Sequence, residues 1–145
     1  MLPTRPTRRC ATGVTGHAEA IRISFDPEVI SYADILDIFF HIHDPTQLNR
    51  QGIDIGSQYR SAIFPHSPEQ AAEARVAIGR AQTEWGQKIM TKIEGDAPWY
   101  VAEDHHQGYF AREGAGNGYC VAVVAPKLAK FRKSYAERLK AGVTV

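Results

Sequence analysis

The order of hydrophobic patterns along the chain constrains its fold more than any other feature of the sequence. Alternating apolar and polar residues predict a strand from His17 to Phe25, and two further short strands over 59–64 and 89–94. Apolar residues at helical spacing predict a helix from Ser31 to about His43 and another from Ser67 to Trp85. Strands separated by helices in this order favour a small two-layer α/β sandwich with a thin, three-stranded sheet.

The expected helices carry recognisable start signals. Ser31 is a good N-cap with Asp34 at the capping-box position, and Ser67 is followed by Pro68 at the first helical position. A third helix is expected from Pro126, with one apolar stripe along it. We read its basic residues as the solvated face of a docked helix.

Composition limits the class of protein. The 145 residues carry 17 Lys and Arg against 16 Asp and Glu, a net charge of +1, so the chain as a whole has no electrostatic reason to bind nucleic acid or an acidic membrane. No apolar run approaches the length of a membrane span, and the first residues lack a secretory h-region. We therefore expect a cytoplasmic protein with an irregular arm over 1–11 and one domain over 12–145.

Glu19 is an unusual residue for the expected first strand. The alternation puts it on the face shared by Ile21, Ile23 and Phe25, which would point toward the core. Burial disfavours an ionised carboxylate, so a carboxyl group there would stay protonated and could act as a general acid. The alternative is a strand-end glutamate that turns to solvent or pairs with an arginine.

Asp54 and Tyr59 flank Gly56 at the end of a long polar loop that starts at Asp44. A carboxylate and a phenol in one loop could converge on a single polar atom of a ligand. Each also has a structural explanation, an Asx turn for Asp54 and core packing for Tyr59.

The two cysteines are too few for a disulfide framework, so we expect thiols in a reducing compartment. Cys120 follows the glycine-rich stretch EGAGNG, where a thiol could swing toward a partner. It could equally be a small buried residue at the start of a strand. Cys10 stands beside Arg8 and Arg9, a setting that favours a reactive thiolate.

Two clusters of histidine and carboxylate residues raise the hypothesis of a metal-dependent hydrolase. Their spacing argues against it, because residues two apart on a helix do not face each other and adjacent residues of an extended segment point to opposite sides. We therefore expect no zinc or iron. The clusters are His41, His43 and Asp44, and Asp104, His105 and His106.

From about Thr12 to Lys140 the chain closely resembles the A-type peptide-methionine (S)-S-oxide reductases. The resemblance rests on the stretches TGHAEAIRISFDP, HDPTQLNRQGIDIGSQYRSAIF, AEDHHQGYF and GYCVAVVAPKLAKFRK, in that order. It implies a ferredoxin-like two-layer sandwich. It also implies reduction of methionine S-sulfoxide, free or in proteins, by thiol chemistry with thioredoxin as the external reductant and no bound cofactor.

The resemblance also implies roles for individual residues. Glu19, in TGHAE, matches the acid that protonates the departing oxygen, and Asp54 and Tyr59 match residues that hold the sulfoxide oxygen. Cys120, in GYC, matches the resolving cysteine that converts a sulfenic acid into a disulfide.

One motif of the family has no counterpart. The family's nucleophile lies in a Gly-Cys-Phe-Trp motif upstream of TGHAE, and Cys10, without Phe-Trp neighbours, is not assigned this role. We expect a chain that lacks the family's first strand and helix, is truncated, and is inactive alone. The alternative is a non-catalytic module that binds methionine sulfoxide or thioredoxin.

Overall fold

The computed structural model describes residues 16–95, 97–114 and 116–140. It divides into two compact units, Met1–Val101 and Ala102–Val145, and each is described by itself. The expected arm over 1–11 and Cys10 lie outside the described residues. Among the helices of the described part, none is long and apolar enough to cross a membrane.

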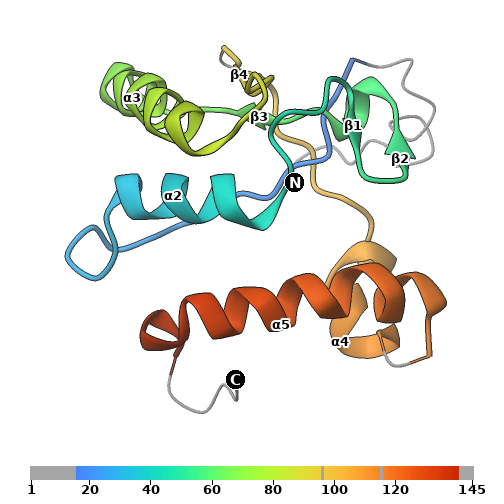
Figure 1. Cartoon of the computed structure of the whole chain (residues 1–145). Helices are drawn as coiled ribbons and strands as arrows, with labels where there is room; N and C mark the ends of the chain where they lie inside the picture. The colour runs from blue at the N-terminus through green and yellow to red at the C-terminus, as the bar shows by residue number, and fades with distance from the viewer. Residues whose placement is uncertain (1–15, 96, 115, 141–145) are drawn as a thin grey trace. The chain divides into compact units, whose positions relative to one another are not determined.

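Two helices form the framework of the first unit, α2 (Tyr32–Ile42) and α3 (Pro68–Glu84), which pack against each other (Figure 1). The Ser31 hydroxyl accepts the Asp34 N–H at 3.1 Å, which forms one half of a capping box. The Ser67 hydroxyl accepts the Gln70 N–H at 3.2 Å in the same way. Both predicted helices and both predicted N-caps are confirmed.

The core of the first unit lies between these two helices and the segments that contain Ile63 and Ile89. Leu36 and Phe40 are buried on α2, where Phe40 is 1% exposed. The facing residues of α3 are small, which lets the two helices approach closely. The buried apolar residues of this core are Leu36, Phe40, Ile63, Ala74, Ala77, Ala81 and Ile89.

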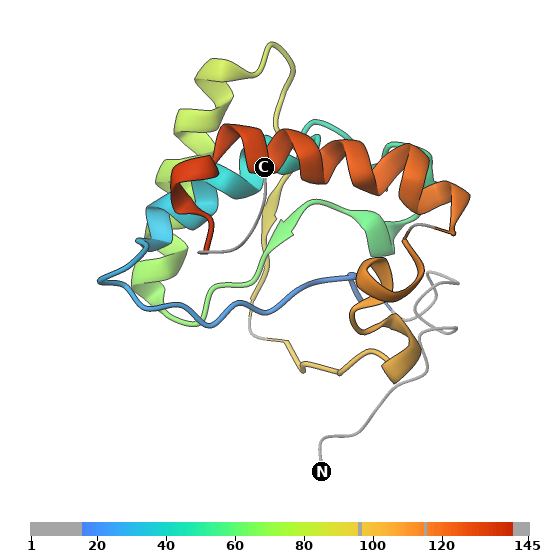
Figure 2. The same ribbon diagram turned by 90° about the horizontal axis from the view of Figure 1, so that it is seen from below.

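Within the described residues, four two-residue strands pair in two separate sheets. The strands β1 (Arg50–Gln51) and β2 (Asp54–Ile55) form an antiparallel hairpin. The strands β3 (Ala62–Ile63) and β4 (Lys92–Ile93) pair in parallel, with α3 as the crossover between them (Figure 2, green and yellow). The mixed α/β class is confirmed, and so is strand structure in the middle of two predicted segments. The single three-stranded sheet is wrong, and the ferredoxin-like arrangement is not confirmed.

The predicted strand from His17 to Phe25 is also wrong, since the structure assigns no strand within residues 16–31. Ile21 is 79% exposed and Ile23 is 51% exposed, so the expected face does not point into the core. Glu19 is exposed as well. Alternation identifies the two faces of an extended segment, but a strand also needs a neighbouring strand to pair with, and sequence periodicity does not supply one.

The second unit is helical in its described part. It contains η2 (Asp104–His106), α4 (Tyr109–Glu113), the π-helix η3 (Cys120–Val124), α5 (Ala125–Ser134) and η4 (Ala136–Arg138). The predicted helix at Pro126 is confirmed as α5 (Figure 2, red). A wide turn precedes it, in which the Ala125 N–H donates to the Cys120 carbonyl, and Pro126 lacks the N–H that a continuous α-helix would use. Cys120 therefore begins a helical turn, so its alternative placement at a strand start is wrong.

Candidate functional site

The loop that begins at Asp44 is held in shape by polar side chains. The Gln51 amide grips the backbone of Asp44: its Oε1 accepts the Asp44 N–H at 3.1 Å, and its Nε2 donates to the Asp44 carbonyl at 3.2 Å. The Asp44 carboxylate accepts the Thr46 N–H at 2.9 Å, which makes an Asx turn. At the tip of the hairpin, Gly52 has a φ of +61° and donates to Gln47 Oε1 at 2.7 Å. The loop is therefore an ordered structure.

This loop carries Asp54 and Tyr59 on either side of Gly56, as the sequence suggested. Asp54 lies on β2, opposite Gln51, and Tyr59 is the last residue of the turn η1 (Ser57–Tyr59). The Tyr59 N–H donates to the Gly56 carbonyl at 3.0 Å. Both residues are partly buried.

The backbone between these two residues requires glycine. Gly56 has a φ of +148°, a conformation that residues with a side chain rarely adopt. A Cβ atom at this position would lie 2.8 Å from the Nε2 of Gln58, so the Gln58 side chain would have to shift. Gln58 is itself 4% exposed, so its amide side chain is folded over the bare Gly56 backbone.

Glu19 meets this turn through its backbone. Its N–H donates to the Gln58 carbonyl at 2.8 Å, which places Glu19 beside the turn that ends at Tyr59. The structure thus brings Glu19, Asp54 and Tyr59 to one region of the first unit. Because Glu19 is exposed, the expectation that its side chain faces the core is wrong.

An ion pair that sequence analysis missed ties the turn to β4. Arg60 Nε lies 2.9 Å from Glu94 Oε1, with the two side chains 15% and 29% exposed. Arg60 Nη1 also donates to the Ser57 carbonyl at 2.9 Å. The arginine that follows Tyr59 in the sequence was a possible signal of an ion pair. Its partner, Glu94, could not be identified from the sequence, because all of α3 lies between the two residues along the chain.

His43 is used in the packing of the first unit. Its Nδ1 lies 2.6 Å from the Phe39 carbonyl, and because a carbonyl only accepts, Nδ1 carries the proton. Its Nε2 lies within hydrogen-bond distance of the Ser61 hydroxyl, at 2.7 Å. The Ser61 oxygen is in turn 2.7 Å from the Thr91 hydroxyl, so this chain of hydrogen bonds joins α2 to the residues beside β3 and β4.

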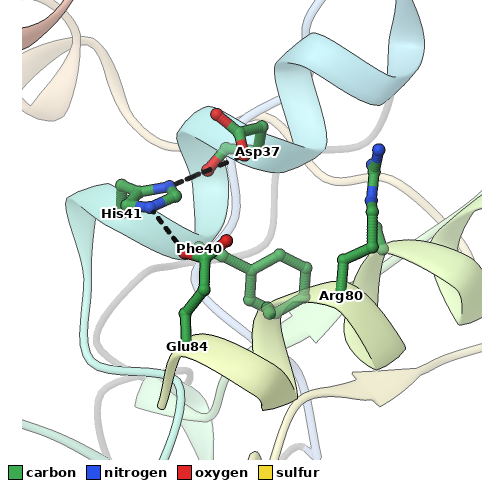
Figure 3. Close-up of a pocket in the computed structure, with 7 residues that line it drawn as sticks. Asp37, Phe40, His41, Arg80 and Glu84 are labelled. Carbon is green, nitrogen blue, oxygen red and sulfur yellow. Dashed lines mark hydrogen bonds and ion pairs between the residues drawn. The ribbon is translucent and has the colours of Figure 1, made fainter.

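His41 bridges the two packed helices (Figure 3). Its Nδ1 donates to the Asp37 carbonyl at 2.7 Å, and its Nε2 is 3.1 Å from Glu84 Oε2. These residues line a cavity of about 70 Å³ between α2 and α3, together with Phe40 and Arg80. Across the part of the chain that the structure describes, no group of three or more histidine, cysteine or acidic residues could hold a metal ion.

Cys120 lies in the second unit, which is described by itself. It is a free thiol, 3% exposed, at the first position of η3. Its N–H donates to Asn117 Oδ1 at 3.1 Å, and Asn117 Nδ2 donates to the Tyr109 hydroxyl at 3.0 Å. A side chain from the preceding glycine-rich stretch therefore caps the turn that carries the thiol.

Comparisons of the structure define the class of protein. The structure of this chain is similar to that of reduced Mxr1 of Saccharomyces cerevisiae, with a TM-score of 0.74 and 38% sequence identity. The match covers 79% of this chain and 64% of Mxr1. The structure is also similar to methionine sulfoxide reductase A of Corynebacterium diphtheriae, with a TM-score of 0.69, 33% identity, and coverage of 79% and 60%. The matched part thus spans less than two thirds of either solved chain. The fold and the loop therefore define the class of protein: a mixed α/β domain related to methionine sulfoxide reductases.

Sequence comparisons lead to the family. The protein-family model described as "Peptide methionine sulfoxide reductase" matches residues 4–139. The chain is 64% identical over 124 residues to the peptide methionine sulfoxide reductase MsrA of Erwinia tasmaniensis, covering 86% of this chain and 70% of that protein. It is 50% identical over 141 residues to the MsrA of Deinococcus radiodurans, covering 96% and 68%. The chain belongs to the peptide methionine sulfoxide reductase family.

Proposed function

We propose that this chain takes part in the reduction of methionine S-sulfoxide, free or in proteins, to methionine. The observation that carries the proposal is the hydrogen bond from the Glu19 N–H to the Gln58 carbonyl, because it joins the segment that carries Glu19 to the turn that ends at Tyr59. Membership of the family supports the same chemistry. An acid and a phenol beside one partly exposed loop suit a small polar oxide.

The sulfoxide oxygen is the atom that this region would handle. Tyr59 would donate its hydroxyl proton in a hydrogen bond to that oxygen, and Asp54 would orient it through its own hydrogen bonds. Glu19, in its protonated form, would give a proton to the oxygen as negative charge develops there. Exposure of Glu19 lets its carboxyl group take up a proton from water for the next cycle.

The electrons come from thiols. In the thiol chemistry that the family implies, a cysteine thiolate attacks the sulfoxide sulfur and the sulfur–oxygen bond of the substrate breaks. The oxygen passes to the cysteine sulfur and takes up a proton, which leaves methionine and a cysteine sulfenic acid. We propose Cys120 as the resolving thiol, which displaces water from the sulfenic acid to give a disulfide. An external dithiol such as thioredoxin then reduces this disulfide, which fits a reducing compartment such as the cytoplasm. The attacking role is assigned to neither Cys10 nor Cys120.

Calorimetry with a short peptide containing methionine S-sulfoxide tests the proposal without requiring turnover. We expect the S-sulfoxide to bind more tightly than the R-sulfoxide and the unoxidised peptide. Tyr59→Phe removes one hydrogen bond to the oxygen and should weaken S-sulfoxide binding about fivefold to tenfold. Tyr32→Phe is the matched control, since Tyr32 packs against the core and should leave binding unchanged. Equal binding of both epimers, or no effect of Tyr59→Phe, would contradict the proposal.

A non-catalytic binding module is the second candidate. The sequence has two cysteines, and the described one is buried, which favours recognition without attack. This candidate predicts that the chain binds the S-sulfoxide peptide and that Cys120→Ser binds it equally tightly. It also predicts that Cys120 forms no disulfide with a sulfenic acid. Formation of a mixed disulfide between Cys120 and a sulfenic acid partner would exclude it.

A further inference from the structure

We infer that Gln58 is a positioning residue of the proposed site, and that it acts by holding Glu19 in register with Tyr59 and Asp54. The inference rests on the proposed function, because it concerns the geometry of the same site. Gln58 was not among the residues that the sequence singled out. It touches no substrate in this account, and its effect passes through the backbone.

A backbone hydrogen bond links Glu19 to Gln58. Glu19 is far from Gln58 in the sequence, and the 2.8 Å hydrogen bond between the Glu19 N–H and the Gln58 carbonyl joins their two segments. The next residue after Gln58 is Tyr59. The direction of the Gln58 carbonyl therefore fixes where Glu19 sits relative to the Tyr59 phenol.

The Gln58 side chain fixes the direction of that carbonyl. The Gln58 side chain is buried and folded back on Gly56, close enough that a Cβ on Gly56 would collide with the Gln58 amide. Gly56 in turn donates its N–H to the Asn49 carbonyl at 2.9 Å and accepts the Tyr59 N–H at 3.0 Å. A buried side chain with this close contact leaves the turn one arrangement, since interiors are closely packed. Removing the side chain frees the turn to rotate the carbonyl away from Glu19.

Arg60 anchors the turn at its other end. Arg60 holds the Ser57 carbonyl at 2.9 Å while its guanidinium pairs with Glu94. Because this anchor does not involve the Gln58 side chain, loss of that side chain should loosen the Glu19 link and leave the turn attached to β4. The expected defect is local.

The experiment compares three variants of the full chain. Gln58→Ala removes the packed side chain, and Gln58→Met keeps its length and bulk without the amide. Gln51→Ala is the matched control, since it removes another amide that orders the same loop but contacts Asp44 instead of Gly56. Should Gln58→Ala not fold, Gln58→Asn carries the same expectation, because its amide is one methylene too short to reach Gly56.

Two readouts separate positioning from general loosening. In the free protein, hydrogen exchange of the Glu19 amide, followed by NMR, should accelerate about tenfold or more in Gln58→Ala, since that hydrogen bond opens more often. Binding of the S-sulfoxide peptide should weaken about fivefold to tenfold, with the unoxidised peptide unaffected. Gln58→Met should restore both to within about threefold of the unchanged chain, because packing over Gly56 is retained.

Several results would overturn the inference. They are an unchanged Glu19 exchange rate in Gln58→Ala, a Gln58→Met variant as defective as Gln58→Ala, or a Gln51→Ala control that shows the same two defects. Failure of the proposed function looks different. In that case the unchanged chain shows no preference for the S-sulfoxide peptide, while the exchange measurements still report whether Gln58 holds Glu19.

Discussion

The ion pair between Arg60 and Glu94 should contribute measurably to the stability of the first unit. Its two atoms are 2.9 Å apart and its side chains are 15% and 29% exposed. An exposed pair contributes about 0.2–1 kcal/mol, whereas breaking a buried pair costs about 3–5 kcal/mol. A pair this shielded but not fully buried should show a coupling energy of about 1–2 kcal/mol. The single change Arg60→Ala should cost more than the coupling, because it also removes the hydrogen bond to Ser57.

A double-mutant cycle of Arg60→Ala, Glu94→Ala and the pair isolates this coupling. The free energy of unfolding of each protein is measured by urea denaturation, at low salt and again in about 0.5 M NaCl, where charges exposed to solvent are strongly screened. We expect most of the coupling to survive the salt, since both side chains are largely shielded. A coupling below about 0.3 kcal/mol, or one that disappears in salt, would refute the reasoning and class the pair with ordinary surface pairs.

Three further predictions follow from single features. Ser31→Ala removes the cap of α2 and should lower the free energy of unfolding by about 1 kcal/mol, measured in urea, whereas an unchanged value would mean the capping box is ineffective. A hydrogen bond from its own backbone N–H, and then one from Ser67, lower the pKa of the Glu69 carboxyl below its ordinary value. Its stabilising effect is therefore present above the ordinary carboxyl pKa and is lost as the pH falls through the lowered one, so Glu69→Gln should be destabilising near neutral pH and harmless in acid, as urea titrations at both pH values would show. Finally, the purified chain should not reduce methyl sulfoxides with dithiothreitol as reductant, because no attacking thiol is assigned; turnover that disappears in a Cys120→Ser or Cys10→Ser variant would disprove this.

The helices could be predicted from the sequence because their signals are local. Ser31 with Asp34, and Ser67 with Pro68, mark helix starts through hydrogen bonds within four residues. The order of short strands and helices was also enough for the mixed α/β class. In each case the pattern and the interaction that causes it lie in the same stretch of chain.

The predicted strand at residues 17–25 and the predicted burial of Glu19 are wrong, because both depend on what lies next to that segment. The alternation of apolar and polar residues is a property of one segment, whereas strand pairing and burial need a second segment in contact with it. The same reason hid Gln58: its importance comes from the Glu19 N–H, a contact that no local pattern announces. Asp54 and Tyr59 were found because the loop that unites them is continuous in sequence. Their roles, with those of Glu19 and Cys120, stay predictions.

Uncharged side-chain amides hold several backbone atoms of the hairpin loop that presents Asp54. The amides of Gln47 and Gln51 bind backbone atoms, and neighbouring contacts join the Ser61 hydroxyl to His43 and Thr91. Such bonds respond little to dissolved ions, whereas urea competes directly for amide and peptide groups. The loop should therefore keep its form from dilute buffer to brine, and should be among the first parts of the protein to open in a denaturant, ahead of the packed pair of helices behind it.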